Sequence, residues 1–124
     1  MSENQHSFLD VETTLVSWLG ELLSVPVYLE APEEMPERFI TVERVGGSSS
    51  NMVVDRPTVA IQTWAPTRIA AGLLANDVAS AVALMPKEIQ RITRATVSSY
   101  ENYPLKQDET TIPRYQVTID LVTR

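Results

Sequence analysis

The sequence has no cysteine and a single histidine, His6. Without cysteine there can be no disulfide, no thiolate nucleophile and no zinc site that uses sulfur. A hydrolytic triad needs a base to activate its nucleophile, and the one histidine lies in a polar leader, residues 1–6, that we expect to be flexible. We therefore predict a protein that is not an enzyme, with no catalytic residue, no metal and no cofactor.

Long apolar runs are also missing. No stretch approaches the roughly 18 apolar residues that a membrane-spanning helix needs. The leader has neither the basic flank nor the apolar stretch of a signal peptide. These absences predict a soluble intracellular product that has no membrane contact.

Basic residues are few in comparison with acidic ones. The chain has 10 Lys and Arg against 16 Asp and Glu, which gives a net charge of −6. Tight binding of DNA or RNA depends on neutralising phosphates and releasing their counterions. The acidic balance therefore disfavours nucleic acid as a tightly bound partner of the monomer.

What is present suits one folded domain. The chain has 124 residues, 44% of them hydrophobic, and this is close to the average for globular proteins. We find no repeat, heptad series or linker, so we predict a single domain over residues 1–124.

The first helical pattern begins at Ser7, where Ser7 and Asp10 resemble a capping box, and we expect Pro26 to close it. Its apolar residues recur at helical spacing and are Val11, Leu15, Trp18, Leu19 and Leu22. We expect a helix whose apolar side, including Trp18, is buried.

The second helical pattern begins after Thr67, a plausible N-cap, and runs to about Met85, where we expect Pro86 to end it. Its apolar stripe consists of Ile69, Leu73, Leu74, Val78, Ala81, Val82 and Met85. The helix is also rich in alanine, and small side chains let a helix lie close to a sheet.

Strand patterns fill much of the remaining chain. They are a short extended segment at Val27–Glu30 and longer stretches at Phe39–Val45, Thr58–Trp64, Ile92–Tyr100 and Tyr115–Val122. The order of elements predicts an α+β fold, with a mostly antiparallel sheet of four to five strands and two helices packed on one face. Because many strand residues are polar, we expect the other face to be hydrated or to meet another subunit.

Three segments lie between these patterns. Ala31–Glu37 has two prolines, and its carboxylates lack the spacing of a calcium loop, so we interpret it as a solvated acidic loop. Gly46–Asn51, GGSSSN, lacks the glycine spacing of a phosphate-binding loop and predicts a mobile hairpin tip. Glu101–Pro113 is long enough for a functional loop.

An Asp–Arg pair and a tryptophan are further candidates for binding a ligand, or for a purely structural role. The pair Asp55 and Arg56 beside Pro57 favours a turn or an exposed ion pair, and we expect the pair to anchor the preceding tip. Trp64 lies at a core-like position, where burial is more common than stacking on a ligand.

Several short motifs follow one another in a specific order. They are FITVERVGG at Phe39–Gly47, DRP at Asp55–Pro57, Trp-Ala at 64–65, an alanine-rich helix, and RYQ at Arg114–Gln116. In this order they resemble the tail terminator proteins of long-tailed bacteriophages, of the type found in phages of actinobacteria and related prophages. The resemblance spans nearly the whole chain, and we expect departures at Glu33–Glu34 and at the loop from Pro104 to Pro113.

The resemblance implies a structural protein of the virion neck, assembled in the host cytoplasm. Such proteins form a ring, commonly of six subunits, that caps the tail tube, ends its polymerisation and offers a docking surface to the head connector. Six copies of charge −6 would carry −36, so the genome would pass through the lumen without specific binding. The implied partners are thus other copies of the chain, the tail-tube protein and the connector or stopper.

In such a ring we expect the segments Gly46–Asn51 and Glu101–Pro113, with the residues that anchor them, to contact neighbouring subunits or partners. The candidate contact residues are Gly46, Gly47, Ser48, Ser49, Ser50, Asn51, Asp55, Arg56, Glu101, Asn102, Lys106, Gln107, Asp108 and Arg114. The polar face of the sheet is a further candidate.

Two alternatives stay open. One is another neck component, either a head–tail stopper or adaptor or a subunit like that of the tail tube. The other is a small enzyme or ligand-binding domain with a cleft around Trp64 and Tyr115. A ligand that binds only the native state would raise the melting temperature of that domain.

Overall fold

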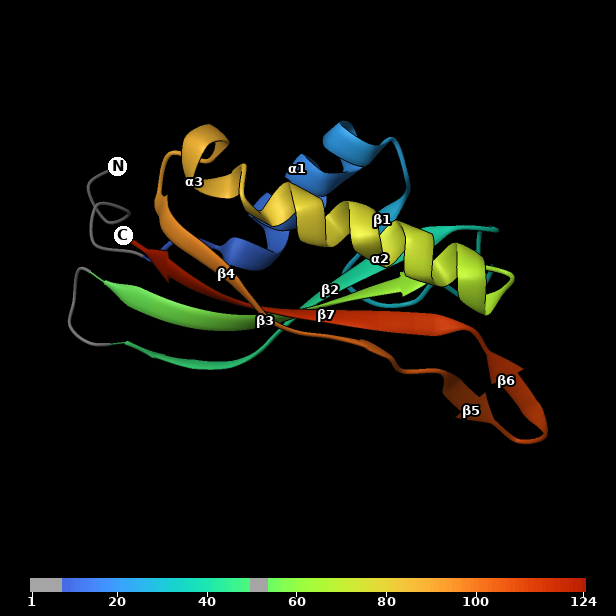
Figure 1. Ribbon diagram of the computed structural model, residues 1–124. Coiled ribbons are helices and arrows are strands. Elements are labelled where there is room, and N and C mark those ends of the chain that lie inside the picture. The colour runs from blue at the N-terminus through green and yellow to red at the C-terminus, as the bar shows by residue number, and fades with distance from the viewer. Residues whose placement is uncertain (1–7, 50–53) are drawn as a thin grey trace.

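The computed structural model describes residues 8–49 and 54–124. Its elements in chain order are α1 (Val11–Leu23), β1 (Val27–Tyr28), β2 (Phe39–Ser49), β3 (Asp55–Trp64), α2 (Arg68–Val82), α3 (Met85–Glu88), β4 (Ile92–Asn102), β5 (Leu105–Gln107), β6 (Thr110–Ile112) and β7 (Arg114–Thr123). Figure 1 shows the three helices on one side of a twisted sheet. The predicted α+β class, with helices on one face of a mostly antiparallel sheet, is confirmed.

The main sheet has the strand order β1-β2-β3-β7-β4. Every neighbouring pair is antiparallel except β1 and β2, which run parallel. Alternate side chains of β2, β3 and β7 point toward the helices, and the others form a face turned away from them. We call this second face the polar face.

The start of α1 differs from the prediction. Asp10 is itself the N-cap, because its side chain accepts a hydrogen bond from Thr13 N at 3.2 Å. Ser7, the other half of the predicted capping box, lies outside the described residues. The helix ends at Leu23, before Pro26, because Ser24 is in the left-handed conformation with φ 55° and donates its N–H to Gly20 O.

The end of α2 also differs. Thr67 is the N-cap as predicted, and its hydroxyl accepts from Ala70 N at 3.1 Å. The helix stops at Val82, and Pro86 lies in the first turn of the short helix α3 instead of ending a long one. Proline fits there because the first helical N–H groups have no partner inside the helix.

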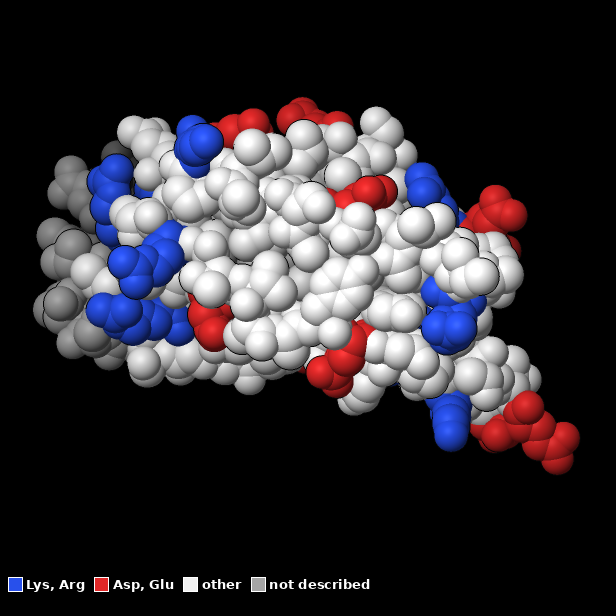
Figure 2. Space-filling model, viewed as in Figure 1, with Lys and Arg blue, Asp and Glu red and all other residues white. Residues whose placement is uncertain are grey.

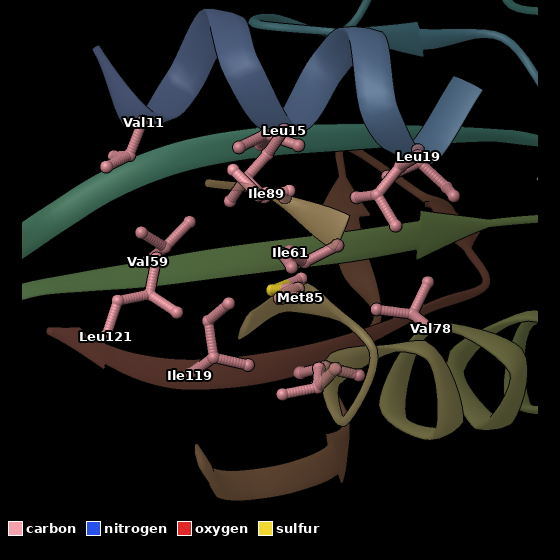
Figure 3. Packing of buried hydrophobic residues seen from close by; sticks show 14 of the residues in the cluster. Val11, Leu15, Leu19, Val59, Ile61, Val78, Met85, Ile89, Ile119 and Leu121 are labelled. Carbon is pink, nitrogen blue, oxygen red and sulfur yellow. The ribbon is translucent and has the colours of Figure 1, made fainter. Parts of the chain in front are cut away.

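The hydrophobic core lies between the helices and the sheet. Figure 3 shows α1 directing Val11, Leu15 and Leu19 toward Val59 and Ile61 of β3. Other fully buried members are Ile40, Val42, Leu74, Val78, Met85, Ile92, Ile119 and Leu121. Packing of α2 on the sheet is close, and Thr63 Oγ1 donates to the Ala71 carbonyl oxygen at 2.9 Å.

The two tryptophans have different surroundings. Trp64 is buried, as the sequence predicts, although it lies on the polar face and not in the main core. Trp18 is only half-buried, and its Nε1 donates to Glu88 Oε1 at 3.0 Å. That bond joins the outer sides of α1 and α3.

Candidate interaction surfaces

The predicted mobile tip begins inside a strand. Strand β2 continues through Gly46, Gly47, Ser48 and Ser49, which pair with residues of β3 down to Asp55. The register shifts between Arg44 and Gly46, so a bulge precedes the glycines. The prediction that the strand ends at Val45 and that the tip begins at Gly46 is therefore wrong, because β2 runs to Ser49, whereas Ser50 and Asn51 lie outside the described residues.

Asp55 is fully buried and is held by a residue that the sequence does not suggest. Arg44 NH1 and NH2 donate to its two carboxylate oxygens at 2.7 and 3.0 Å, and Arg44 Nε donates to Gly46 O at 3.0 Å. The hydrogen bonds that Arg44 donates to Asp55 are the main reason that the pKa of Arg44 is raised. Asp55 thus holds β2 against β3, and its carboxylate faces inward instead of toward a partner.

Arg56, the other half of the predicted pair, is exposed, and only its backbone N–H bonds to Asp55, at 3.0 Å. The expected Asp55–Arg56 ion pair is replaced by the Arg44–Asp55 pair across the two strands. Because side chains of consecutive strand residues point to opposite faces, Arg56 is directed to the surface while Asp55 is buried.

The predicted loop from Glu101 to Pro113 contains a hairpin. Strands β5 and β6 pair in register Leu105 to Ile112, and Asp108, with φ 53°, lies in the turn between them. Lys106, Gln107 and Asp108 are exposed on this hairpin, which projects beyond the main sheet (Figure 1). Glu101 and Asn102 end β4 and are exposed as well.

Arg114 lies at the base of this hairpin and is occupied by contacts within the chain. Its guanidinium carbon is 5.0 Å from the centroid of the Trp64 ring and 4.7 Å from that of Tyr103. Arg114 Nε also donates to Tyr103 O at 2.8 Å. Burial is the main cause that lowers the pKa of Arg114, and Tyr103 acts in the opposite direction. This predicted contact residue therefore fixes the hairpin to the sheet.

A row of hydrogen bonds crosses the polar face. Trp64 Nε1 donates to Thr41 Oγ1 at 3.1 Å, and Thr41 Oγ1 donates to Gln62 Oε1 at 3.1 Å. Gln62 Nε2 donates to Gln116 Oε1 at 2.9 Å, and Gln116 Nε2 donates to Thr118 Oγ1 at 3.4 Å. These groups satisfy one another across three strands, so the face is preorganised and does not need a partner to order it.

Trp64 and Tyr115 do not line a common cleft. Trp64 lies on the polar face, where its ring stacks on Phe39 with a centroid distance of 5.0 Å. Tyr115 points to the helix side, where a Cβ added to Gly72 of α2 would lie 3.2 Å from its ring. The predicted cleft around these two residues is not formed.

Helix α2 has exposed aliphatic side chains that the sequence pattern placed in its apolar stripe. Ile69 is 71% and Leu73 is 64% exposed, whereas Leu74 and Val78 are buried. Tyr100 of β4 lies beside them, because its hydroxyl donates to Gly72 O at 3.0 Å, and burial is the main cause that raises its pKa. We call Ile69, Leu73 and Tyr100 the α2 patch, and Figure 2 shows that the middle of the face over α2 is largely uncharged.

The helical phase separates the α2 patch from the core. Each residue turns the helix by about 100°, so Ile69 lies about 200° from Ala71, which is buried. Leu73 repeats the position of Ile69 one turn later. The helical phase can be assigned from the alanines Ala71 and Ala75 as well as from the larger apolar residues. That phase would have placed Ile69 and Leu73 outside the core.

Within the part of the chain that the structure describes, no group of three or more His, Asp or Glu residues could hold a metal ion. Among the helices of residues 8–49 and 54–124, none is long and apolar enough to cross a membrane. The acidic segment after β1 has no helix or strand between Leu29 and Arg38, as expected of a loop.

Comparison with known proteins does not assign the chain to a family. No protein-family model matches the sequence, and a search of curated proteins found no match.

Proposed function

We propose that this chain is a subunit of a ring that caps a bacteriophage tail tube, ends its polymerisation and receives the head connector. The observation that carries the proposal is the α2 patch, in which Ile69 and Leu73 are 71% and 64% exposed. The order of the FITVERVGG, DRP and RYQ motifs supports the tail terminator in particular among proteins that act by assembly.

The α2 patch favours assembly because exposed aliphatic groups gain free energy when a partner covers them. Ile69 and Leu73 are neighbours on one side of the helix, and Tyr100 extends the same surface to β4. Much of the surrounding face is uncharged (Figure 2), although the carboxylate of Asp77 acts electrostatically on Tyr100, so a partner can cover most of the patch without desolvating many ions.

The hydrogen-bonded polar face supports a structural role from the opposite side of the sheet. The side chains of Gln62 and Gln116 are engaged with each other at 2.9 Å, and Trp64 is engaged with Thr41. A rigid sheet of this kind suits a ring subunit, because small errors in subunit geometry accumulate around a ring and would prevent closure.

Polymerisation of the tail-tube protein encoded in the same genome tests the proposal. Tubes are grown with and without an excess of the full chain, and their lengths are measured by negative-stain microscopy. We expect added protein to stop growth, so that tubes are shorter and one end has extra density. An unchanged length distribution with bare ends would contradict the proposed function.

A further inference from the structure

Two hollows of opposite charge lie on the sheet, one at its β1–β2 edge and the other over β3, β7 and β4. The first has a volume of about 490 Å³ and is lined by Glu12, Glu30 and Glu43 together with polar-face residues such as Gln62. It lies at the β1–β2 edge, where the loop after β1 passes beside β2. We call it the acidic hollow.

The negative charge of the acidic hollow is fixed in place. Glu12 of α1 reaches the edge of β2, where its Oε2 accepts a hydrogen bond from Arg44 N at 2.8 Å. The Arg44 guanidinium is directed to Asp55 by two hydrogen bonds, and Glu12 also stabilises its positive charge. Glu30 and Glu43 are exposed and free to face a partner's cations.

The second hollow has a volume of about 400 Å³ and lies between β3, β7 and β4. Arg56 and Arg94 line it and are exposed, and its acidic residue, Asp120, accepts a hydrogen bond from Thr58 Oγ1 at 2.8 Å. Strand register places Arg91 and Arg124 at the same end, because Ile92 pairs with Thr123. Figure 2 shows basic side chains gathered at this end, and we call the second hollow the basic hollow.

The arrangement of the hollows selects the kind of partner. The acidic hollow lies at the β1–β2 edge and the basic hollow extends to β4, which is the other edge of the same sheet. A two-fold dimer through either hollow would bring like charges together. A head-to-tail contact would instead join opposite charges and leave a free hollow on each outer copy, ready for the next one.

Direct pairing of strand edges is disfavoured, so side chains must provide the contact. Strand β4 has two register shifts along its length, between Ile92 and Arg94 and between Val97 and Ser99. At the other edge, Glu12 occupies the N–H of Arg44 that an added strand would need. Irregular or blocked edges of this kind prevent sheet extension.

We propose that the basic hollow of one copy, through Arg56 and Arg94, binds the acidic hollow of the next copy, through Glu30 and Glu43. This inference rests on the proposed ring function and assigns the contact that closes the ring. The partner is a second copy of the chain, placed head to tail.

Charge reversal tests the contact. Arg94→Glu and Glu43→Arg each place like charges across it, and we expect each variant alone to need at least about a hundredfold higher concentration to assemble. In a ring where the two variants alternate, one contact joins the two altered hollows, whose charges are again opposite. The next contact joins the two unaltered hollows. The mixture should therefore form rings in which the two variants alternate.

Assembly is measured by native mass spectrometry and by microscopy of capped tube ends. Glu21→Arg, on the exposed side of α1, is the matched control for Glu43→Arg and should assemble as the unaltered chain does. Melting curves check that each variant is folded. Both altered residues are exposed, so the fold should tolerate each change.

Three outcomes would overturn the inference. If either variant alone assembles like the unaltered chain, or if the mixture fails where the unaltered chain forms rings, this contact is wrong while the ring function stands. If the unaltered chain itself neither assembles nor caps tubes, the proposed function fails and this inference fails with it.

Discussion

Gly47 is the residue on which the outer half of β2 most depends. Its φ is +108°, a backbone conformation that residues other than glycine rarely adopt. A Cβ at this position would also lie 2.7 Å from the Pro57 Cα of the paired strand, which is backbone and cannot move aside cheaply. Gly46 differs, because a Cβ there meets nothing within 4 Å.

We predict that Gly47→Ala lowers the free energy of unfolding by about 1–3 kcal/mol, since it combines backbone strain with a steric clash. Gly46→Ala should change it by less than about 0.5 kcal/mol. Urea denaturation followed by circular dichroism measures both. Equal stability of the two variants would show that β2 is not held in this conformation.

The Arg44–Asp55 pair shows where sequence reasoning fails at the scale of single residues. The sequence correctly marks Asp55 as part of an anchor, but proximity in the chain suggests Arg56 as its partner. The true partner lies across the hairpin, and its alignment depends on the bulge between Arg44 and Gly46. Glycine within a strand often marks a bulge, but Gly46 and Gly47 do not show which residues the bulge aligns across the hairpin, so the pairing could not be predicted.

At the scale of elements, periodicity predicts long helices and strands well and short ones poorly. Helices α1 and α2 and strands β2, β3, β4 and β7 all have strong patterns over several residues. Strands β5 and β6 have three residues each, too few to show alternation, and they exist because the turn at Asp108 brings them together. The helix break before Pro86 likewise depends on local geometry at Ala83 and Leu84.

The α2 patch gives a prediction for a whole element. Ile69→Ser with Leu73→Ser should change the stability of the isolated chain by less than about 1 kcal/mol, because both side chains are mostly exposed. The same double variant should no longer cap tail tubes, since it removes the apolar surface that a partner covers.

Thermal melting and counts of capped tube ends measure the two effects of that double variant. Leu22→Ser, on the exposed side of α1, is the control, because Leu22 is an aliphatic residue that is 40% exposed on another helix. The control should still cap tubes. Full capping by the double variant would remove the α2 patch from the assembly surface.

At the scale of the whole molecule, charge is distributed unevenly over the small acidic fold. Although the net charge is −6, one end of the fold is basic and carries Arg56, Arg91, Arg94 and Arg124. Composition gives the sum of the charges but not their positions, which depend on strand order and register. The sequence could thus predict an acidic chain, whereas the two hollows required the fold.

The most direct test of the account is the mass of the species held at the ends of tail tubes. Capped tubes are purified, cross-linked gently and disassembled, and the released protein is weighed by native mass spectrometry. The account predicts a closed ring, and six copies of 13.8 kDa would weigh 6 × 13.8 = 82.8 kDa. Release of single 13.8 kDa chains alone, with no cross-linked ring, would contradict it.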